Sequence, residues 1–112
     1  MTKVVFIDQV GRTILGDEVS RDLKTLVVKN PAMINVNQAQ GGQLQVQLFP
    51  LFFAEFIESA ARSTGTVWEF NRDQITLGQD VPVDERLINQ YKQVFGLPVP
   101  AAEPPTIKLF DE

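Results

Sequence analysis

The stretch that decides the fold lies near the N-terminus and reads Lys3-Val4-Val5-Phe6-Ile7-Asp8-Gln9-Val10-Gly11-Arg12-Thr13-Ile14-Leu15-Gly16. Its first apolar run is rich in β-branched residues and predicts a strand over 3–8. Gly11 predicts a hairpin turn, and a second strand is expected over 12–19. Gly16 lies inside this second strand, where a glycine indicates a bulge or a sharp bend. The stretch therefore predicts a hairpin whose second strand bends.

The chain continues to residue 77 as short strands separated by turns. Further strands are predicted over 25–30, 43–48, 66–70 and 74–77. Pro31 has no N–H for a sheet ladder, so the third strand lies at an edge or bends there, and it resumes over 33–36. The strand over 43–48 alternates Gln with apolar residues, which indicates one buried face.

Residues 83–95 carry a helical pattern. Apolar residues recur there at helical spacing, Pro82 precedes the pattern and Gly96 follows it. The aromatic segment 51–57 fits a strand or a short helix, because its periodicity does not decide between them. Several strands followed by one helix predict a mainly β chain, either a small barrel or a sandwich.

The chain ends in a tail over 98–112 that holds four of its seven prolines. This composition predicts an extended segment, and the stretch 106–110 can dock on the sheet as an added strand. We therefore expect a single domain over 1–97, with its helix at 83–95, followed by the Pro-rich tail.

Two motifs resemble the Sm-like fold, a strongly bent five-stranded open barrel. Gly11 and Gly16, five positions apart with Ile14 between them, are similar to its first motif, in which one glycine permits the hairpin and the other lets the strand bend. Its second motif, two short strands around a tight polar turn, resembles Trp68-Glu69-Phe70-Asn71-Arg72-Asp73-Gln74-Ile75-Thr76-Leu77. The resemblance covers residues 3–36 and 66–77.

Three further segments resemble a group of short, uncharacterised Sm-like proteins of marine and cyanobacterial tailed phages and marine metagenomes. The segments are Leu26-Val27-Val28-Lys29-Asn30-Pro31, Leu48-Phe49-Pro50-Leu51-Phe52 and Leu87-Ile88-Asn89-Gln90-Tyr91-Lys92-Gln93-Val94-Phe95-Gly96. This resemblance implies an Sm-like barrel with an inserted strand or hairpin over 43–58. The helix follows the last strand here, whereas ordinary Sm proteins carry their helix before the first.

The resemblance also implies a candidate nucleic-acid site. In an Sm ring, two turns of each subunit converge at the pore, where bases of single-stranded RNA stack and form hydrogen bonds. The candidates at the matching turns of this chain are Arg21, Lys24, Asn71 and Arg72. Arginine suits the role because it stacks on a base and also reaches phosphate. Here Asp73 follows Arg72, where the family has Gly, and the alternative is that these side chains are solvated turn residues.

The composition excludes several classes of function. The 112-residue chain has 10 basic and 14 acidic residues, a formal charge of −4, no Cys and no His. It therefore has no catalytic triad with His, no thiol nucleophile and no Cys-based zinc site. Its clustered carboxylates suit turns and a helix start, and they are Asp73, Asp80, Asp84 and Glu85. We predict no enzyme, and hence no catalytic residue, metal, cofactor or small-molecule substrate.

No run of the sequence approaches the ~20 apolar residues of a membrane helix. The short apolar start is interrupted by Asp8 and does not resemble a signal peptide. We therefore expect no membrane partner and a cytoplasmic location, which would be the host cytoplasm for a phage-encoded chain.

Large apolar residues are concentrated between positions 48 and 56. They pack a core or, where one small barrel cannot bury them all, form a protein contact. The candidate oligomer interface is Leu48, Phe52, Phe53 and Phe56. Because Sm-like subunits join by pairing edge strands, we expect a homo-oligomer. The predicted function is a non-catalytic binding or assembly module of the Sm-like type that binds single-stranded RNA. The alternative is a phage-borne protein-interaction or structural factor that uses the barrel without RNA.

Overall fold

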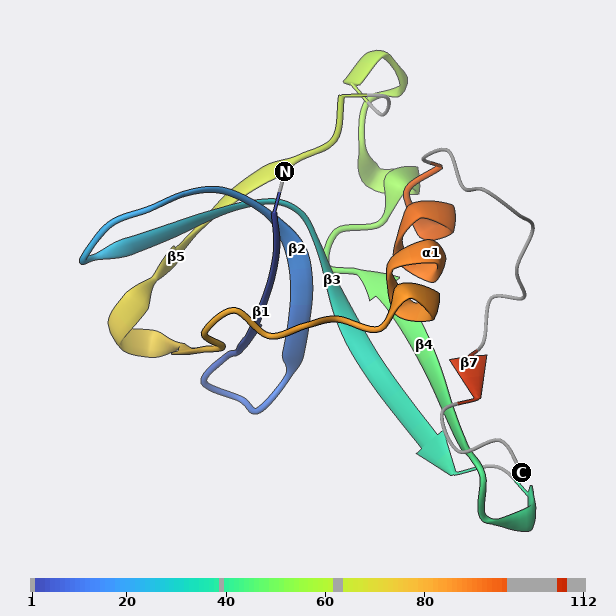
Figure 1. Ribbon diagram of the computed structural model, residues 1–112. Coiled ribbons are helices and arrows are strands. Elements are labelled where there is room, and N and C mark those ends of the chain that lie inside the picture. The colour runs from blue at the N-terminus through green and yellow to red at the C-terminus, as the bar shows by residue number, and fades with distance from the viewer. Residues whose placement is uncertain (1, 39, 62–63, 97–106, 109–112) are drawn as a thin grey trace.

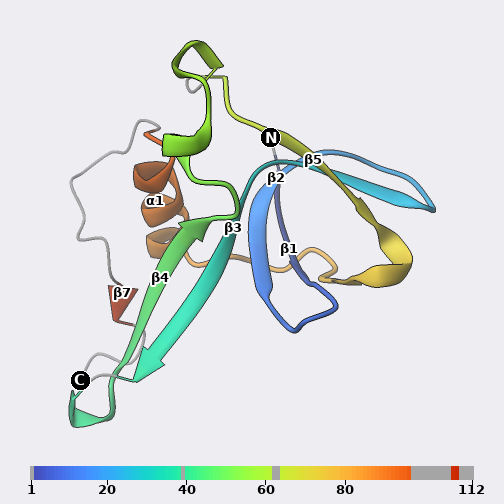
Figure 2. The same ribbon diagram turned by 180° about the vertical axis from the view of Figure 1, so that it is seen from behind.

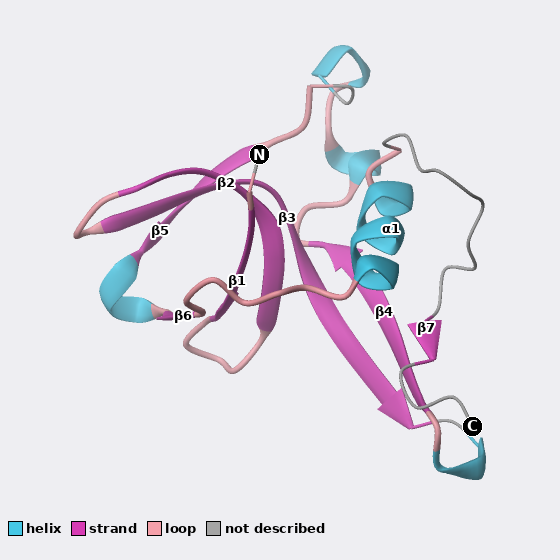
Figure 3. Cartoon of the chain, in the orientation of Figure 1, coloured by secondary structure: helices cyan, strands magenta, loops and turns pink. Residues whose placement is uncertain are grey.

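The computed structural model describes residues 2–38, 40–61, 64–96 and 107–108 (Figure 1). The strands are β1 (Lys3–Ile7), β2 (Thr13–Arg21), β3 (Thr25–Gln38), β4 (Leu44–Pro50), β5 (Val67–Asn71), β6 (Thr76–Leu77) and β7 (Ile107–Lys108). One α-helix, α1 (Glu85–Val94), follows β6. Short 3-10 helices are η1 (Gln40–Gly42), η2 (Ala54–Phe56), η3 (Ser59–Ala61) and η4 (Arg72–Gln74). The predictions of a mainly β chain and of a helix near its end are confirmed (Figure 3).

The described strands form one antiparallel sheet that is not closed. Its order is β6-β1-β2-β3-β4-β7, and β5 pairs with β3 beside β4. The strands β5 and β6 follow each other in the chain through η4, but each pairs with a single strand among the described residues. The sheet therefore has edges at β5 and β6, and the five-stranded barrel stays a prediction.

Strand β3 is shared between two parts of the sheet. One of its sides pairs with β2 over residues 26–34, from Thr13↔Ile34 to Arg21↔Leu26. Its other side pairs with β5 over residues 25–29 and then with β4 over residues 32–38. The strand thus changes partner at Asn30 and Pro31. In Figure 1, β3 and β4 accordingly extend as a long hairpin away from β1, β2 and β5.

The change of partner coincides with a bulge and a bend. The register of β2 against β3 shifts between Leu15 and Asp17, so that Asn30 and Pro31 stand opposite the single residue Gly16. Asn30 has a left-handed backbone, with φ of 53°. A Cβ atom added at Gly16 would clash with Val28 Cγ1 and lie 3.3 Å from the Lys29 carbonyl oxygen. The prediction that the second strand bends at Gly16 is confirmed, and Pro31 bends a central strand rather than marking an edge.

The bend separates two clusters of buried side chains. The first, beside β5 and β6, contains Val4, Phe6, Ile14, Leu26 and Val28. Phe70 of β5 packs on it, with its ring centre 4.7 Å from that of Phe6. The second, beneath α1, contains Leu15, Ala32, Leu48 and Tyr91. Ile14 and Leu15 are neighbours in β2 and belong to different clusters, because successive side chains of a strand point to opposite faces.

Helix α1 is held on the sheet by Tyr91. Its buried hydroxyl donates a hydrogen bond to the carbonyl of Asn30 at 2.7 Å and lies 3.3 Å from that of Lys29. The ammonium of Lys3 lies 5.0 Å from the centre of the Tyr91 ring and pairs with the Asp17 carboxylate at 2.7 Å. The helix therefore contacts the sheet at the bend, where carbonyl groups are diverted from the regular ladder.

The ends of α1 follow ordinary capping chemistry. Asp84 is the N-cap, and its carboxylate accepts a hydrogen bond from the Arg86 backbone N–H at 2.8 Å. Gly96, with φ of 68°, follows the C-cap and donates its N–H to the Gln93 carbonyl. The predicted helix over 83–95 is confirmed with tighter bounds.

Two other segments differ in detail from expectation. The aromatic segment 51–57 forms no strand, and the short helix expected as the alternative is present as the 3-10 helix η2. The last predicted strand, 74–77, shortens to β6 because η4 occupies its start. The expected added strand is present as β7, and the rest of 106–110 lies outside the described residues.

Substitution of Gly16 tests the packing of the bend. Gly16→Ala is expected to lower the free energy of unfolding by about 2 kcal/mol, because the new methyl group overpacks against Val28. In a Val28→Ala background the same substitution should cost about 1 kcal/mol less, because the clashing methyl group is gone. Urea denaturation followed by the fluorescence of Trp68 measures both, and equal costs in the two backgrounds would contradict this account.

Alkaline pH tests the burial of Tyr91. Burial, with the nearby Asp17 carboxylate as a second cause, raises the pKa of Tyr91 above its ordinary value near 10. Because the unfolded chain loses this proton first, stabilisation is complete below pH ~10 and is lost as the pH rises further. Tyr91→Phe should remove that part of the pH dependence and lower neutral-pH stability by about 1 kcal/mol. Tyr91 is the chain's single tyrosine, so native tyrosinate absorbance appearing near pH ~10 would refute its burial.

Candidate functional site

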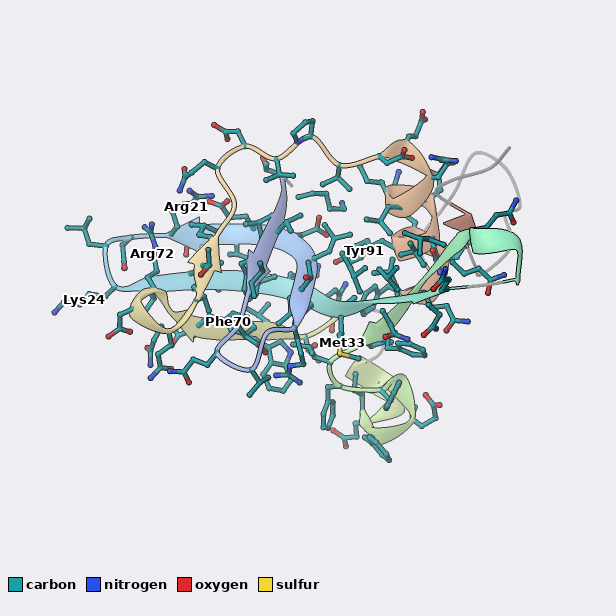
Figure 4. The ribbon with its side chains drawn as sticks, turned by 90° about the horizontal axis from the view of Figure 1, so that it is seen from below. Arg21, Lys24, Met33, Phe70, Arg72 and Tyr91 are labelled. Carbon is teal, nitrogen blue, oxygen red and sulfur yellow. The ribbon has the colours of Figure 1, made fainter. Side chains whose placement is uncertain are left out.

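The four nucleic-acid candidates lie at one end of the sheet. Arg21 and Lys24 flank the β2–β3 turn, while Asn71 and Arg72 lie where β5 passes into η4. The two segments are hydrogen-bonded neighbours, because Thr25 pairs with Asn71 and the Arg72 N–H donates to the Lys24 carbonyl at 2.8 Å. Figure 4 shows Arg21, Lys24 and Arg72 together at this end, far from Tyr91. The structure thus brings all four residues into one region.

Asp22 organises the β2–β3 turn. Its Oδ1 accepts hydrogen bonds from the Thr25 and Lys24 backbone N–H groups at 2.7 and 2.8 Å, and the Thr25 hydroxyl lies 3.1 Å away. These donors, the Thr25 N–H first, lower the pKa of Asp22. The turn is therefore built around a charged Asp side chain, which is common turn chemistry.

Arg72 joins the two turns. Its Nη1 donates a hydrogen bond to the Asp22 carbonyl oxygen at 2.7 Å. Together with the bond from its N–H to Lys24, this contact attaches η4 to the β2–β3 turn. The guanidinium therefore has a structural role, and a ligand would meet it already engaged with the protein backbone.

The remaining two cations differ from each other. The Arg21 guanidinium forms a two-point contact with the Glu18 carboxylate, with distances of 3.0 and 2.7 Å, and this contact raises the pKa of Arg21. Lys24, in contrast, points away from the ribbon in Figure 4 and has no ion pair within 4 Å across the described parts of the chain. Lys24 is the most available of the three cations.

A hollow of about 430 Å³ lies beside these turns, and it is lined by Leu23, Lys24, Asn71, Asp73 and Gln74. Leu23 is 94% exposed at the tip of the β2–β3 turn. The hollow presents one ammonium, one carboxylate and two amides, so it can accept or donate hydrogen bonds without a strong net charge.

The candidate interface residues divide between the core and the surface. Leu48 is only 5% exposed and packs in the cluster beneath α1, so its side chain is not part of an open surface. Phe52 and Phe53 are about two-fifths exposed, and Phe56 is 70% exposed. The ring centre of Phe56 lies 5.9 Å from that of Phe52 and 6.3 Å from that of Phe53. These three rings form a connected, partly exposed group.

Trp68 completes this aromatic cluster, defined as Phe52, Phe53, Phe56 and Trp68. Its ring centre lies 5.9 Å from that of Phe52, and its indole N–H donates to the Thr66 hydroxyl at 2.9 Å. Sequence reasoning placed Trp68 in a strand and gave it no role at the interface. The available signal was the alternation of side chains along β5, which places Trp68 on the same face as the inward Phe70. Because Trp68 lies near the end of the strand, its ring extends beyond the core cluster.

A pocket of about 260 Å³ adjoins the aromatic cluster at the C-terminal end of α1. It is lined by Asn30, Pro50, Phe52, Ile57, Gly65, Thr66, Val94, Phe95 and Gly96. Most of these groups are apolar. The polar exceptions are Asn30, whose Oδ1 accepts a hydrogen bond from the Thr66 N–H at 3.2 Å, and Thr66 itself, whose hydroxyl accepts from the Trp68 indole. The pocket thus lies between the bend of β3 and the segment that precedes β5.

The carboxylate of Asp84, at the start of α1, is engaged in local structure. Asp84 caps the helix and pairs with Arg86 at 3.0 Å, and hydrogen bonds from Arg86 lower its pKa. The described residues contain no group of three Asp or Glu side chains that could hold a metal ion. No helix within them is long and apolar enough to cross a membrane.

Comparisons with models of known protein families, with curated proteins and with solved structures found no match to this chain. The Sm-like resemblance therefore stays a prediction from the sequence motifs.

Proposed function

We propose that the chain is a small non-catalytic assembly module that binds further copies of itself through the edges of its sheet. The observation that carries the proposal is the pair of edge strands β5 and β6, each paired on one side only within the described chain. Such edges present rows of backbone donors and acceptors that pair with another strand. Subunits of the Sm-like type join by pairing edge strands, and we propose that β5 of one copy lies beside β6 of the next.

The direction of the backbone groups in β5 supports this use. The Asn30 N–H donates to the Thr66 carbonyl and the Arg72 N–H to the Lys24 carbonyl, both at 2.8 Å. Because hydrogen-bonded pairs alternate along an antiparallel ladder, Trp68 and Phe70 direct their groups toward β3. The N–H and C=O groups of Val67, Glu69 and Asn71 consequently point to the open edge.

The order of strands supports an Sm-like bent barrel as the finer description of the fold. β6 pairs with β1, and β5 pairs with β3, so the two edge strands lie at the ends of a bent path and are joined by η4. The insertion, over 43–58, consists of β4 and the aromatic segment and lies between β3 and β5. We propose that this barrel is the scaffold and that the insertion distinguishes this chain from the ordinary family.

The aromatic cluster supports an interface beside β5. Trp68 belongs to β5 itself, and the other three rings come from the segment between β4 and β5. Partly exposed aromatic side chains gathered at one place are typical of protein contacts, because their burial contributes much of the binding energy. We propose that the next copy covers part of this cluster when it pairs with β5.

Proline at position 69 tests the edge. The Glu69 N–H points away from β3, so Glu69→Pro should keep the fold while it removes a donor from the edge and blocks pairing with another copy. Wild-type protein is expected to sediment with a mass several times 12.5 kDa, and Glu69→Pro close to 12.5 kDa. The matched control Glu69→Ala keeps the N–H and should retain the wild-type mass. A monomeric wild type, or an assembled Glu69→Pro variant with native circular dichroism, would refute the proposal.

Binding of single-stranded RNA is the second candidate function. It is supported by the meeting of the two turns, which gathers Arg21, Lys24, Asn71 and Arg72 beside the hollow. It is weakened by the engagement of Arg21 with Glu18 and of Arg72 with a carbonyl, and by the net charge of −4. An RNA contact would therefore depend mainly on Lys24.

Fluorescence anisotropy with a labelled single-stranded RNA tests this candidate. Binding is expected at ~50 mM salt and should weaken as salt rises. Lys24→Ala should reduce affinity severalfold and lower the salt slope by about 1, as expected for one lost phosphate contact. Lys92→Ala, which removes the same charge from α1, should have little effect. No change in anisotropy at low salt, or equal effects of the two variants, would exclude RNA binding at these turns.

A further inference from the structure

The outer edge of β4 is a third place where backbone groups point away from the sheet. The Leu51 N–H donates to the Pro31 carbonyl at 3.0 Å, which continues the register of β4 against β3. Alternation along the ladder then directs the N–H and C=O groups of Val46 and Leu48 away from β3. These groups face the side of β4 on which β7 lies (Figure 2).

Strand β7 occupies only part of this edge. It pairs through Gln45↔Lys108 and Val46↔Ile107, and no other pair is formed among the described residues. Val46 is the residue whose groups point outward, so Val46↔Ile107 is the hydrogen-bonded pair and Gln45↔Lys108 the non-hydrogen-bonded one. The sequence before β7 contains Pro104 and Pro105, which have no N–H to donate to a neighbouring strand.

The sequence of β4 does not protect this edge. Natural edge strands carry charges or other devices that prevent pairing with further chains. Residues Leu44–Pro50 contain no charged side chain, and Pro50 stands at the end of the strand. In contrast, β5 carries Glu69. An uncharged edge of this kind is a template for an incoming strand, and the strand that the structure places there comes from the C-terminus of the chain.

We propose that the outer edge of β4 is a strand-binding site for the C-terminal segment of a second copy of this chain. The backbone hydrogen bonds between β4 and β7 are the same whether β7 belongs to the same copy or to another copy. The pairing itself therefore favours neither the intramolecular nor the intermolecular arrangement. Ten residues, 97–106, lie along the chain between the helical region and β7, a length that suffices to reach a neighbouring copy. Exchange of an identical element between copies requires no new surface.

This interface is separate from the one in the proposed function, because it uses β4 and not β5 or β6. Where copies are concentrated, as in an assembly, binding of β7 to β4 of another copy competes by mass action with its binding to β4 of its own copy. The site would accept the segment antiparallel to β4, beside α1. Because β4 is uncharged, its pairing should depend little on salt.

Disulfide trapping tests the exchange in the full chain, which contains no cysteine of its own. Opposite Cα atoms of a non-hydrogen-bonded pair lie about 4.5 Å apart, which is within the range that a disulfide spans. Gln45→Cys and Lys108→Cys are prepared as separate proteins, mixed and mildly oxidised. A disulfide-linked heterodimer is expected, with a yield that rises with protein concentration. Replacing Gln45→Cys by Gln47→Cys, on the same face of β4 but out of register, should lower the yield at least tenfold.

The double variant distinguishes the outcomes. If Gln45→Cys with Lys108→Cys in one chain forms an internal disulfide while the mixed single variants form no heterodimer, β7 stays on its own copy and the proposal is overturned. If neither protein forms a bond, the edge does not bind this segment and the proposal is also overturned. At high protein concentration the heterodimer should still form in a Glu69→Pro background, so that failure at β5 and failure at β4 are told apart.

Discussion

The bend of β3 at Asn30 and Pro31 is the constraint on which the rest of the structure depends. One strand has to leave β5 and join β4 while it stays paired with β2. The bulge provides the change of direction, and the absence of a side chain at Gly16 lets β2 follow it closely. The Tyr91 hydroxyl then satisfies the carbonyl of Asn30, which ties the only α-helix among the described residues to the same point.

The bend has a direct consequence for the surfaces of the molecule. It divides one sheet into two parts, each with its own cluster of buried side chains. A sheet divided in this way ends in several places among the described residues, at β5, at β6 and at β7, which covers part of the outer side of β4. The partly exposed aromatic cluster lies in the connection that links the two parts. The backbone edges and these rings, rather than titratable side chains, are the features that a partner would meet.

Several charges near the turns and the helix start are used within the chain. Asp22 builds a turn, Arg72 attaches a neighbouring segment to that turn, Asp84 caps the helix, and Glu18 holds Arg21. Exposed contacts of this kind contribute little stability individually, but they determine the local geometry. Lys24 remains as the available cation at the turns, in a chain whose net charge is −4. This distribution is the reason that we favour assembly over RNA binding.

Local patterns in the sequence were sufficient to predict the strands before the bend, the bend at Gly16 and the helix. Hydrophobic periodicity, glycines at turns and capping residues act over a few neighbouring positions, so they can be read without the fold. The sequence did not predict that β3 pairs first with β5 and then with β4, because this pairing depends on contacts between segments that are distant in the sequence. For the same reason Leu48 became a core residue, Trp68 joined the aromatic cluster and Arg72 became a link between turns. Sequence alone thus determined the elements and the turn residues, whereas the tertiary structure decided which edges stay open and which side chains are already engaged.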